Sequence, residues 1–316
     1  MKIVILDYAT LGYDLDLTAA EKYGEVIKYE TTTQEEAVER VRDAHIVIVN
    51  KIKMNRAVLE NAENLKLICE TATGFDNIDI EYCKSRGITV CNTPAYSSPC
   101  VAQVTVSMVC SLITHLTEYA RCVSSGEYTD GGVANKLIPV YNELCGRTWG
   151  IIGYGNIGKA VGRVAEAFGC RVIVNKRTPA TDCECVDVDT LCREADIISI
   201  HCPLSDETRN LIDERRFSLM KKDAIVVNVA RGAVWDEKAA AEAIKKGQIG
   251  GLGCDVFTAE PFSREHPFYE IKSLDNVILT PHMAWGSFES RTRCYETVIS
   301  NIESYLNGTP KNVVTK

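Results

Sequence analysis

Short apolar runs recur along the chain, and polar stretches with a helical period separate them. In the first third of the chain these runs are apolar on both faces, which is typical of buried strands in a parallel sheet. We predict strands at Lys2–Leu6, His45–Asn50, Leu65–Glu70 and Ile88–Asn92, with helices at Thr33–Arg42 and Asn55–Asn61. This alternation predicts a first α/β half.

The second part of the chain shows the same alternation over a greater length. A long apolar helix is predicted at Ser98–Tyr119, with Pro99 in the first turn, a position that proline favours. An amphipathic helix at Ser287–Leu306 ends the pattern. Six strands are predicted between these helices, at Trp149–Gly153, Arg171–Asn175, Asp196–His201, Ala224–Val229, Gly250–Asp255 and Asn276–Thr280.

A glycine-rich turn follows the first of these six strands. Residues 149–158 read Trp-Gly-Ile-Ile-Gly-Tyr-Gly-Asn-Ile-Gly, and a helix-compatible stretch follows directly. Such a turn between strand and helix is typical of dinucleotide binding, because its glycines allow a tight turn, close approach to a pyrophosphate and close helix packing. The helix N-terminus would hold the pyrophosphate. The predicted turn comprises Gly153, Tyr154, Gly155, Asn156, Ile157 and Gly158.

These patterns predict an α/β protein with two doubly wound parallel-sheet domains, one flavodoxin-like and one of the Rossmann type. Because the last helix follows the nucleotide-binding sheet, we expect residues 1–98 and 286–316 to form a discontinuous substrate domain. Residues 99–285 would form the dinucleotide-binding domain, and the active site would lie in the cleft between the two.

Composition and charge narrow the functional classes. The chain has 316 residues, of which 46% are hydrophobic and 25% charged, as in ordinary globular proteins. The net charge of −8 argues against non-specific binding to nucleic acid or to an acidic membrane surface. The N-terminal apolar run is too short for a signal peptide, and no run reaches the roughly 18 residues of a membrane span. We therefore expect a cytoplasmic protein without nucleic-acid or membrane partners.

Fourteen cysteines are scattered along the chain, and none forms a Cys-x-x-Cys pair. Most fall inside predicted strands and helices, which favours reduced cysteines used as small buried hydrophobic residues. Cys183 and Cys185 lie in an acidic stretch, Asp182–Asp187, where a metal site is conceivable. A solvated loop is the favoured interpretation, because no histidine or second cysteine pair stands at ligand spacing, and we expect no metal.

Three segments at the ends of late strands carry groups that could do chemistry: Asn228–Gly232, Asp255–Pro261 and Thr280–Trp285. Ligands bind outside the carboxyl ends of strands in such sheets. The guanidinium of Arg231 can hold a carboxylate and polarise an adjacent carbonyl, and His282 can exchange a proton that Glu260 helps to hold. Singly these residues could be a surface ion pair, a helix cap and a solvated carboxylate. Together they predict a catalytic set.

The residues after the second strand bear on cofactor choice. NAD-specific domains carry an acid there, roughly 20 residues beyond the glycine turn, which binds the ribose hydroxyls and repels the extra phosphate of NADP. At the corresponding position this chain has Asn175-Lys176-Arg177-Thr178, and the first acidic residue afterwards is Asp182. Arg177 could hold a 2′-phosphate, with Lys176 adding a charge. A basic surface loop is the alternative. We predict a preference for NADPH, with NADH possible.

With these motifs in place, the chain resembles the D-isomer-specific 2-hydroxyacid dehydrogenase family along nearly its whole length. The branch that it resembles most is the glycerate dehydrogenase (hydroxypyruvate reductase) branch, on the segments Thr93–Ser97 and Asn50-Lys51. The matching family motifs are Ala72-Thr73-Gly74-Phe75-Asp76-Asn77-Ile78-Asp79, Val101-Ala102-Gln103, the Gly153–Gly158 turn, His201-Cys202-Pro203-Leu204 with Thr208, and the three catalytic segments.

The resemblance implies a role for each candidate residue. Arg231 would grip the substrate's carboxylate and keto oxygen, His282 would give the proton during reduction, and Glu260 would stabilise that proton and fix the ring. Asp255 would contact the nicotinamide carboxamide. The predicted substrate contacts are completed by Lys51, Thr73 and Gly74, and the further cofactor contacts by Lys176, Arg177, Thr178, Thr105, His201, Pro203, Thr208, Val229, Ala230 and Ala284.

The expected function is reduction of a small 2-keto acid, such as hydroxypyruvate or glyoxylate, to the D-2-hydroxy acid by hydride transfer from NAD(P)H. The alternatives are a dinucleotide-sensing binding module on the same scaffold, and the D-lactate or phosphoglycerate dehydrogenase branch. The formate dehydrogenase branch is disfavoured, because it has Gln where Glu260 stands. The resemblance also implies a homodimer joined through residues 98–145.

Overall fold

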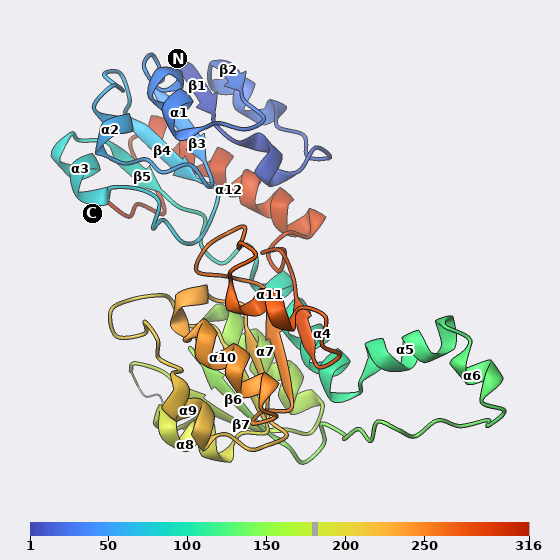
Figure 1. The fold of residues 1–316 in the computed structure, drawn as a ribbon. Coiled ribbons are helices and arrows are strands. Elements are labelled where there is room, and N and C mark those ends of the chain that lie inside the picture. Colours follow the sequence, from blue (N-terminus) through green and yellow to red (C-terminus); the bar gives the residue numbers. More distant parts are fainter. Residues whose placement is uncertain (179–182, 316) are drawn as a thin grey trace. The chain divides into compact units, whose positions relative to one another are not determined.

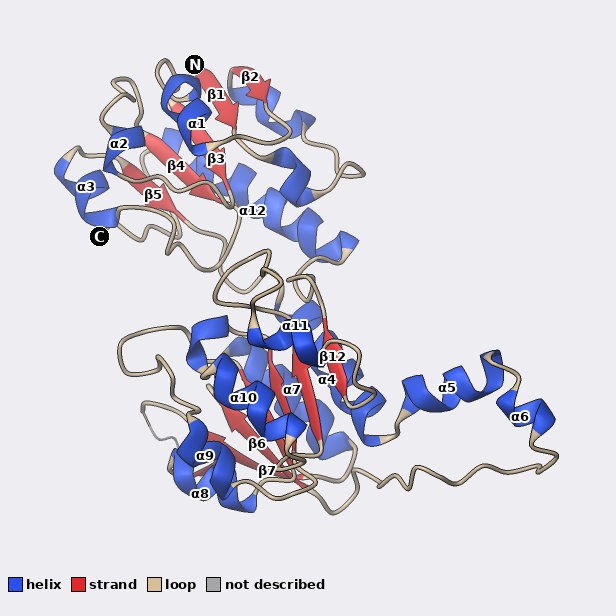
Figure 2. Cartoon of the chain, in the orientation of Figure 1, coloured by secondary structure: helices blue, strands red, loops and turns tan. Residues whose placement is uncertain are grey.

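The computed structural model describes residues 1–178 and 183–315 and divides the chain into two compact units (Figure 1). Unit 1 consists of Met1–Ser97 and Gly286–Lys316, and unit 2 is Ser98–Trp285. Each unit contains a wholly parallel sheet with helices packed on it (Figure 2). The predicted fold class, two parallel-sheet α/β domains, is confirmed.

The sheet of unit 1 has the order β2-β1-β3-β4-β5. Its elements are β1 (Lys2–Ile5), two 3-10 turns (Tyr8–Leu11 and Thr18–Tyr23), β2 (Glu25–Lys28), α1 (Gln34–Arg40), β3 (Ile46–Val49), α2 (Arg56–Leu59), β4 (Leu67–Glu70), α3 (Ile80–Ser85), β5 (Thr89–Cys91) and α12 (Phe288–Leu306). The four predicted strands are present. The edge strand β2 was missed, because charged residues at both its ends break the apolar pattern.

The sheet of unit 2 has the order β12-β11-β10-β9-β6-β7-β8. Its elements are α4 (Ser98–Ile113), α5 (Leu116–Ser124), α6 (Glu127–Asp130), β6 (Thr148–Ile152), α7 (Asn156–Ala167), β7 (Arg171–Asn175), β8 (Glu184–Cys185), α8 (Val188–Glu194), β9 (Ile197–Ile200), α9 (Glu214–Leu219), β10 (Ile225–Asn228), a 3-10 turn (Gly232–Val234), α10 (Glu237–Lys245), β11 (Gly251–Cys254), α11 (Pro267–Ile271) and β12 (Val277–Leu279). All six predicted strands are present.

A seventh strand, β8, corrects the interpretation of the acidic stretch as a solvated loop. Its two residues pair with β7 at the sheet edge, and the side chains of Cys183 and Cys185 pack partly against the core. Acidic residues alternate with the cysteines in this stretch, so the apolar pattern does not reveal a strand of only two residues. Asp182 lies outside the described residues.

Two apolar layers enclose the sheet of unit 2. Helices α8 to α11 cover one face, and α4 and α7 cover the other. Alternate residues of β6 belong to different layers: Ile152 faces the first, and Trp149 and Ile151 face the second. Since the strands are parallel, all their carboxyl ends meet at one edge of the sheet, where the glycine turn and the segments that carry Arg231, Glu260 and His282 follow their strands.

The predicted helix Ser98–Tyr119 is in fact two helices. His115, with a left-handed φ of 50°, separates α4 from α5, and the two are bent by 64°. The apolar periodicity continues through this break, so the pattern alone did not reveal it. No single described helix is long and apolar enough to cross a membrane, and the bent pair passes that test by length and composition only.

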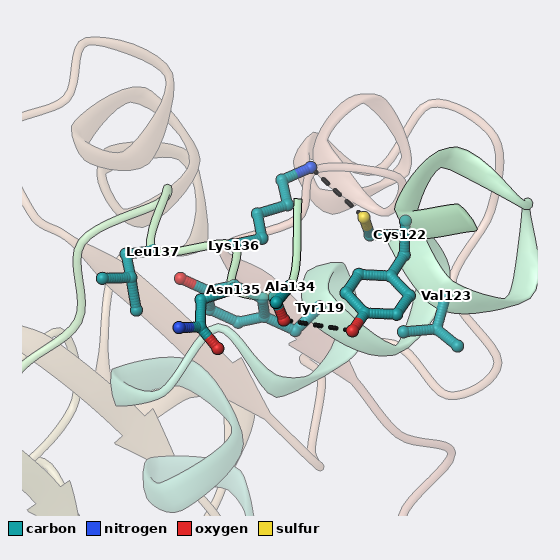
Figure 3. A pocket seen from close by; sticks show the side chains of 8 residues that line it. Tyr119, Cys122, Val123, Ala134, Asn135, Lys136 and Leu137 are labelled. Atoms are coloured by element: carbon teal, nitrogen blue, oxygen red, sulfur yellow. Dashed lines mark hydrogen bonds between the residues drawn. The ribbon is translucent and has the colours of Figure 1, made fainter. Parts of the chain in front are cut away.

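Beyond the bend, α5, α6 and the following chain extend away from the sheet of unit 2 as an arm, residues 116–141 (Figure 1). A pocket of about 260 Å³ lies within the arm, lined by Tyr119, Cys122 and Tyr128 from its helices and by Lys136 from the returning chain (Figure 3). Large apolar side chains of the arm are 42–76% exposed: Leu116, Val123, Tyr128, Val133, Leu137, Ile138, Val140 and Tyr141.

Candidate active site

The glycine turn lies between β6 and α7. Gly153 has a φ of +91°, and a Cβ there would lie 2.4 Å from the backbone nitrogen of Cys202. A Cβ on Gly158 would lie 2.2 Å from the carbonyl oxygen of Gly153, so the helix packs directly on the turn. Gly155 is the N-cap of α7, and apart from its two chain neighbours no described residue has an atom within 4 Å of a Cβ placed there. The helix N-terminus is thus open to an anion.

His201 follows β9 and lies against this turn. Part of the residue is exposed, but both ring nitrogens are buried and have no hydrogen-bond partner among the described residues. Burial lowers the pKa of His201 to about 3, so the ring is neutral and offers one donor and one acceptor. Unused polar atoms beside an open helix N-terminus fit a dinucleotide, which brings both phosphates and hydroxyls.

The predicted phosphate-binding residues follow β7. Lys176 is half-buried, whereas Arg177 and Thr178 are exposed. Within residues 1–178 and 183–315, neither cation has a carboxylate partner. Asn175 instead donates to the carbonyl of Val186, 3.0 Å away, and so ties the end of β7 to the chain after β8. The loop therefore presents two cations without a described counter-charge.

The remaining predicted cofactor residues are spread over three other segments. Thr105 is fully buried in α4 and donates to the carbonyl of Val101 at 2.8 Å. Thr208 donates to the carbonyl of Pro203 at 2.7 Å, which closes the loop after β9. Val229 and Ala230 follow β10, and Ala284 follows β12. Their cofactor contacts stay a prediction.

The candidate acid–base pair forms in the structure. Nδ1 of His282 lies 2.6 Å from Oε2 of Glu260, and both side chains are partly exposed. The other oxygen of Glu260 accepts the backbone N–H of Phe257 at 2.9 Å. Among the described residues, none forms a hydrogen bond with Nε2 of His282, the other ring nitrogen. The carboxylate therefore fixes the orientation of the ring.

Asp255 holds the loop that carries His282. This buried carboxylate accepts the backbone N–H groups of Met283 and Ala284, both at 2.9 Å, and the hydroxyl of Thr280. Burial raises its pKa. His282 itself has a φ of 53°, an uncommon conformation that the anchored loop imposes. The family resemblance implied only a nicotinamide contact for Asp255, and no sequence pattern indicated this anchoring role.

Arg231 lies on the neighbouring loop, after β10. The buried amide of Asn228 accepts the N–H of Ala230 at 3.0 Å and donates to the carbonyl of Arg231 at 2.9 Å. Nη1 of Arg231 donates to the carbonyl of Ala230 at 2.8 Å. A Cβ on Gly232 would lie 2.2 Å from the backbone of Phe257, so the Arg231 and Glu260 loops are in direct contact.

Three of the predicted substrate residues, Lys51, Thr73 and Gly74, belong to unit 1. The hydroxyl of Thr73 donates to the carbonyl of Thr93 at 3.0 Å, which fixes the loop that also holds Gly74. Lys51 has an exposed side chain, and its backbone N–H donates to Asp7 at 2.6 Å. The amide of Asn77 joins these two loops by donating to the carbonyls of Asn50 and Ile52, each at 3.1 Å, and to Glu70.

The described residues contain no group of three or more His, Cys, Asp or Glu arranged to hold a metal ion. The fourteen cysteines are free thiols, and the sulfur atoms of Cys183 and Cys185 lie 3.5 Å apart. Expectations of a metal-free site and of a reducing compartment stay predictions.

Known proteins resemble the whole chain. Residues 106–284 match the model of the NAD binding domain of D-isomer specific 2-hydroxyacid dehydrogenases. The hydroxypyruvate reductase of Blautia hydrogenotrophica is 34% identical over 100% of both chains, and the glycerate dehydrogenase of Methylorubrum extorquens is 36% identical over 99% of this chain and 98% of that one.

A solved structure of an acyclic imino acid reductase in complex with NADPH and D-Arg covers 99% of this chain and 100% of its own, with 31% identity and a TM-score of 0.87. The family match includes the glycine turn, and the full-length matches extend to unit 1. Both findings confirm the resemblance seen in the motifs. The chain belongs to the D-isomer specific 2-hydroxyacid dehydrogenase family and is a nicotinamide-dependent oxidoreductase.

Proposed function

We propose that this enzyme reduces a small 2-keto acid, such as hydroxypyruvate or glyoxylate, to the D-2-hydroxy acid. The observation that carries the proposal is the 2.6 Å pair of His282 and Glu260 on a loop in contact with that of Arg231. A protonated imidazole beside a guanidinium suits a reaction in which negative charge develops on a carbonyl oxygen. The names of the hydroxypyruvate reductase and glycerate dehydrogenase relatives support the same substrate class.

In the proposed reaction Arg231 holds the substrate's carboxylate and polarises its keto oxygen, and Nε2 of His282 donates the proton to that oxygen. Glu260 keeps the ring oriented and compensates its charge. In this proposal the backbone N–H groups at Thr73 and Gly74, together with Lys51, also bind the substrate's carboxylate. Bound reduced nicotinamide supplies the hydride to the carbonyl carbon.

The cofactor would lie along the carboxyl edge of the unit 2 sheet. The open N-terminus of α7 would hold the pyrophosphate, His201 a polar group of the cofactor, and Asp255 the carboxamide. Further contacts are proposed for Thr105, Pro203, Thr208, Val229, Ala230 and Ala284. The decisive test is steady-state reduction of a panel of 2-keto acids with NADH and NADPH, with chiral analysis of the product. Tight cofactor binding without turnover of any acid would favour a binding module instead.

We predict that the wild-type enzyme prefers NADPH over NADH by at least a factor of ten in kcat/KM, about 1.4 kcal/mol. The exposed Arg177 and its neighbour Lys176 would pair with the 2′-phosphate, which NADH lacks. Arg177→Ala should reduce the preference mainly through a higher KM for NADPH, with KM for NADH unchanged. Equal use of both cofactors by the wild type would contradict the assignment of this loop.

We also predict a homodimer in which the arm, residues 116–141, covers apolar surface of a second copy. Eight large apolar side chains exposed on one arm are more than a soluble monomer usually leaves in one place. Sedimentation velocity at micromolar concentration should show a dimer. Val140→Lys, at a position 76% exposed, should weaken it without affecting the fold, whereas Leu306→Lys, at a position 40% exposed on α12, should not. A monomeric wild type would refute the dimer.

A further inference from the structure

A second carboxylate–imidazole pair lies next to the first. Nε2 of His266 is 2.9 Å from Oε2 of Glu237, and each side chain is only 8% exposed. Glu237 is the first residue of α10, and His266 caps the N-terminus of α11. Neither residue belongs to the proposed catalytic set, so this nearly buried pair requires its own explanation.

The hydrogen bonds around His266 fix its tautomer. Its Nδ1 accepts the backbone N–H of Phe268 at 3.2 Å, so the proton of the neutral ring is on Nε2. Nε2 can then only donate, and its acceptor is Glu237. The aromatic rings of Phe257, Phe262 and Phe268 surround the imidazole at centroid distances of 4.9–6.0 Å and hold it in place.

Glu237 connects the imidazole to the loop that carries Glu260. Its Oε1 accepts the backbone N–H of Thr258 at 2.9 Å, and its Oε2 accepts the Thr258 hydroxyl as well as Nε2 of His266. Every partner is a donor, so the group is satisfied as a carboxylate. Thr258 lies two residues before Glu260 and directly after Phe257, whose N–H binds Glu260. One carboxylate therefore ties the Glu260 loop to two helix N-termini.

The same loop backbone touches the segment that carries Arg231. A Cβ on Gly232 would lie 2.2 Å from the carbonyl carbon of Phe257 and 2.3 Å from the nitrogen of Thr258. A movement of the loop at Thr258 would therefore displace both Glu260 and the segment next to Arg231. Close-packed contacts of this kind are hard to compress and therefore transmit strain.

We propose that Glu237 and His266 form a clamp that positions Glu260, and through it the ring of His282, for proton transfer. The inference rests on the proposed function, in which Glu260 orients His282. Both residues are positioning residues, since their described hydrogen bonds go to Thr258, Phe268 and each other. A misplacement of about 1 Å at a reacting group can cost on the order of a hundredfold in rate, so the clamp should matter for turnover.

Two substitutions of His266 separate the clamp from helix capping. The side-chain oxygen of asparagine can still cap α11 at the position of Nδ1, but no donor then reaches Glu237. The amide nitrogen of glutamine lies near the position of Nε2 and can still donate to Glu237, but the cap is lost. We expect His266→Asn to lower kcat at least tenfold, and His266→Gln to keep kcat within about threefold of wild type.

The readouts are kcat, the Kd for reduced cofactor from fluorescence titration, and the melting temperature. The cofactor Kd should stay within twofold in both variants. Asp213→Ala, which removes the cap of α9 from the N–H of Arg216, is the control for capping: it should lower the melting temperature by a few degrees without changing kcat. Wild-type kcat in His266→Asn, or equal losses in His266→Asn and His266→Gln, would overturn the clamp.

A measurement independent of turnover separates the clamp from the proposed function. The short hydrogen bond from His282 to Glu260 should give a downfield imidazole proton resonance in NMR spectra of the wild type. We expect this resonance to disappear in His266→Asn and to persist in His266→Gln. That result in an enzyme that reduces no 2-keto acid would support the clamp and refute the proposed substrate class. A resonance unchanged in His266→Asn would refute the clamp whatever the enzyme reduces.

Discussion

Replacing His282 by alanine is expected to lower kcat for 2-keto acid reduction about a thousandfold. The variant loses the proton that the developing alkoxide needs, and Glu260 is left without its partner at 2.6 Å. The cofactor Kd should stay within twofold, because His282 lies on the loop after β12 and the glycine turn follows β6. Stopped-flow or steady-state assays with a saturating 2-keto acid measure the loss, and fluorescence titration measures binding.

Arg231→Ala should produce a comparable loss, with part of it in KM for the keto acid, because the guanidinium would bind the carboxylate in the ground state as well. Arg215→Ala is the matched control: it removes an exposed arginine of unit 2 that pairs with Asp189 and is not assigned to the proposed site. Near-normal turnover in either the His282 or the Arg231 variant would refute the proposed catalytic roles.

Much of the fold was predictable because parallel strands buried on both faces have a strong apolar signal. All ten strands predicted from apolar runs are present. The two missed strands, β2 and β8, lie at sheet edges. An edge strand has a neighbouring strand on one side only and is partly open to solvent, so charged residues such as Glu25 and Glu184 are tolerated there. The break at His115 was also missed, because a single residue in the left-handed conformation does not change the spacing of the apolar residues in the sequence.

The candidate site was predictable only as a set of residue types at strand ends. Sequence pattern placed Glu260 and His282 after neighbouring strands, and the structure joins them by a hydrogen bond. The contacts that hold them are between residues far apart in sequence, such as Asp255 with Met283 and Glu237 with Thr258. Buried carboxylates in such positions resemble ordinary helix and loop acids until the fold brings their donors together.

The largest effect on cofactor binding is expected from the glycine turn, where two substitutions should behave differently. Gly155→Ala adds a methyl group with no protein atom within 4 Å, and the φ of −84° suits alanine. The fold and melting temperature should be unchanged. The methyl group would, however, occupy the place where the proposed pyrophosphate approaches the backbone, so the Kd for NAD(P)H should rise at least tenfold.

Gly158→Ala should lose both stability and binding, because its Cβ would lie 2.2 Å from the carbonyl oxygen of Gly153 and 3.2 Å from a methyl group of Ile151. The backbone of Gly153 cannot move aside as a flexible side chain can, so α7 must shift away from β6. Overpacking of this kind lowers the free energy of unfolding by about 1–3 kcal/mol. Thermal unfolding and cofactor titration of both variants distinguish the two mechanisms. An unchanged cofactor Kd in Gly155→Ala would mean that the pyrophosphate does not approach the N-terminus of α7, and the proposed cofactor site would have to be abandoned.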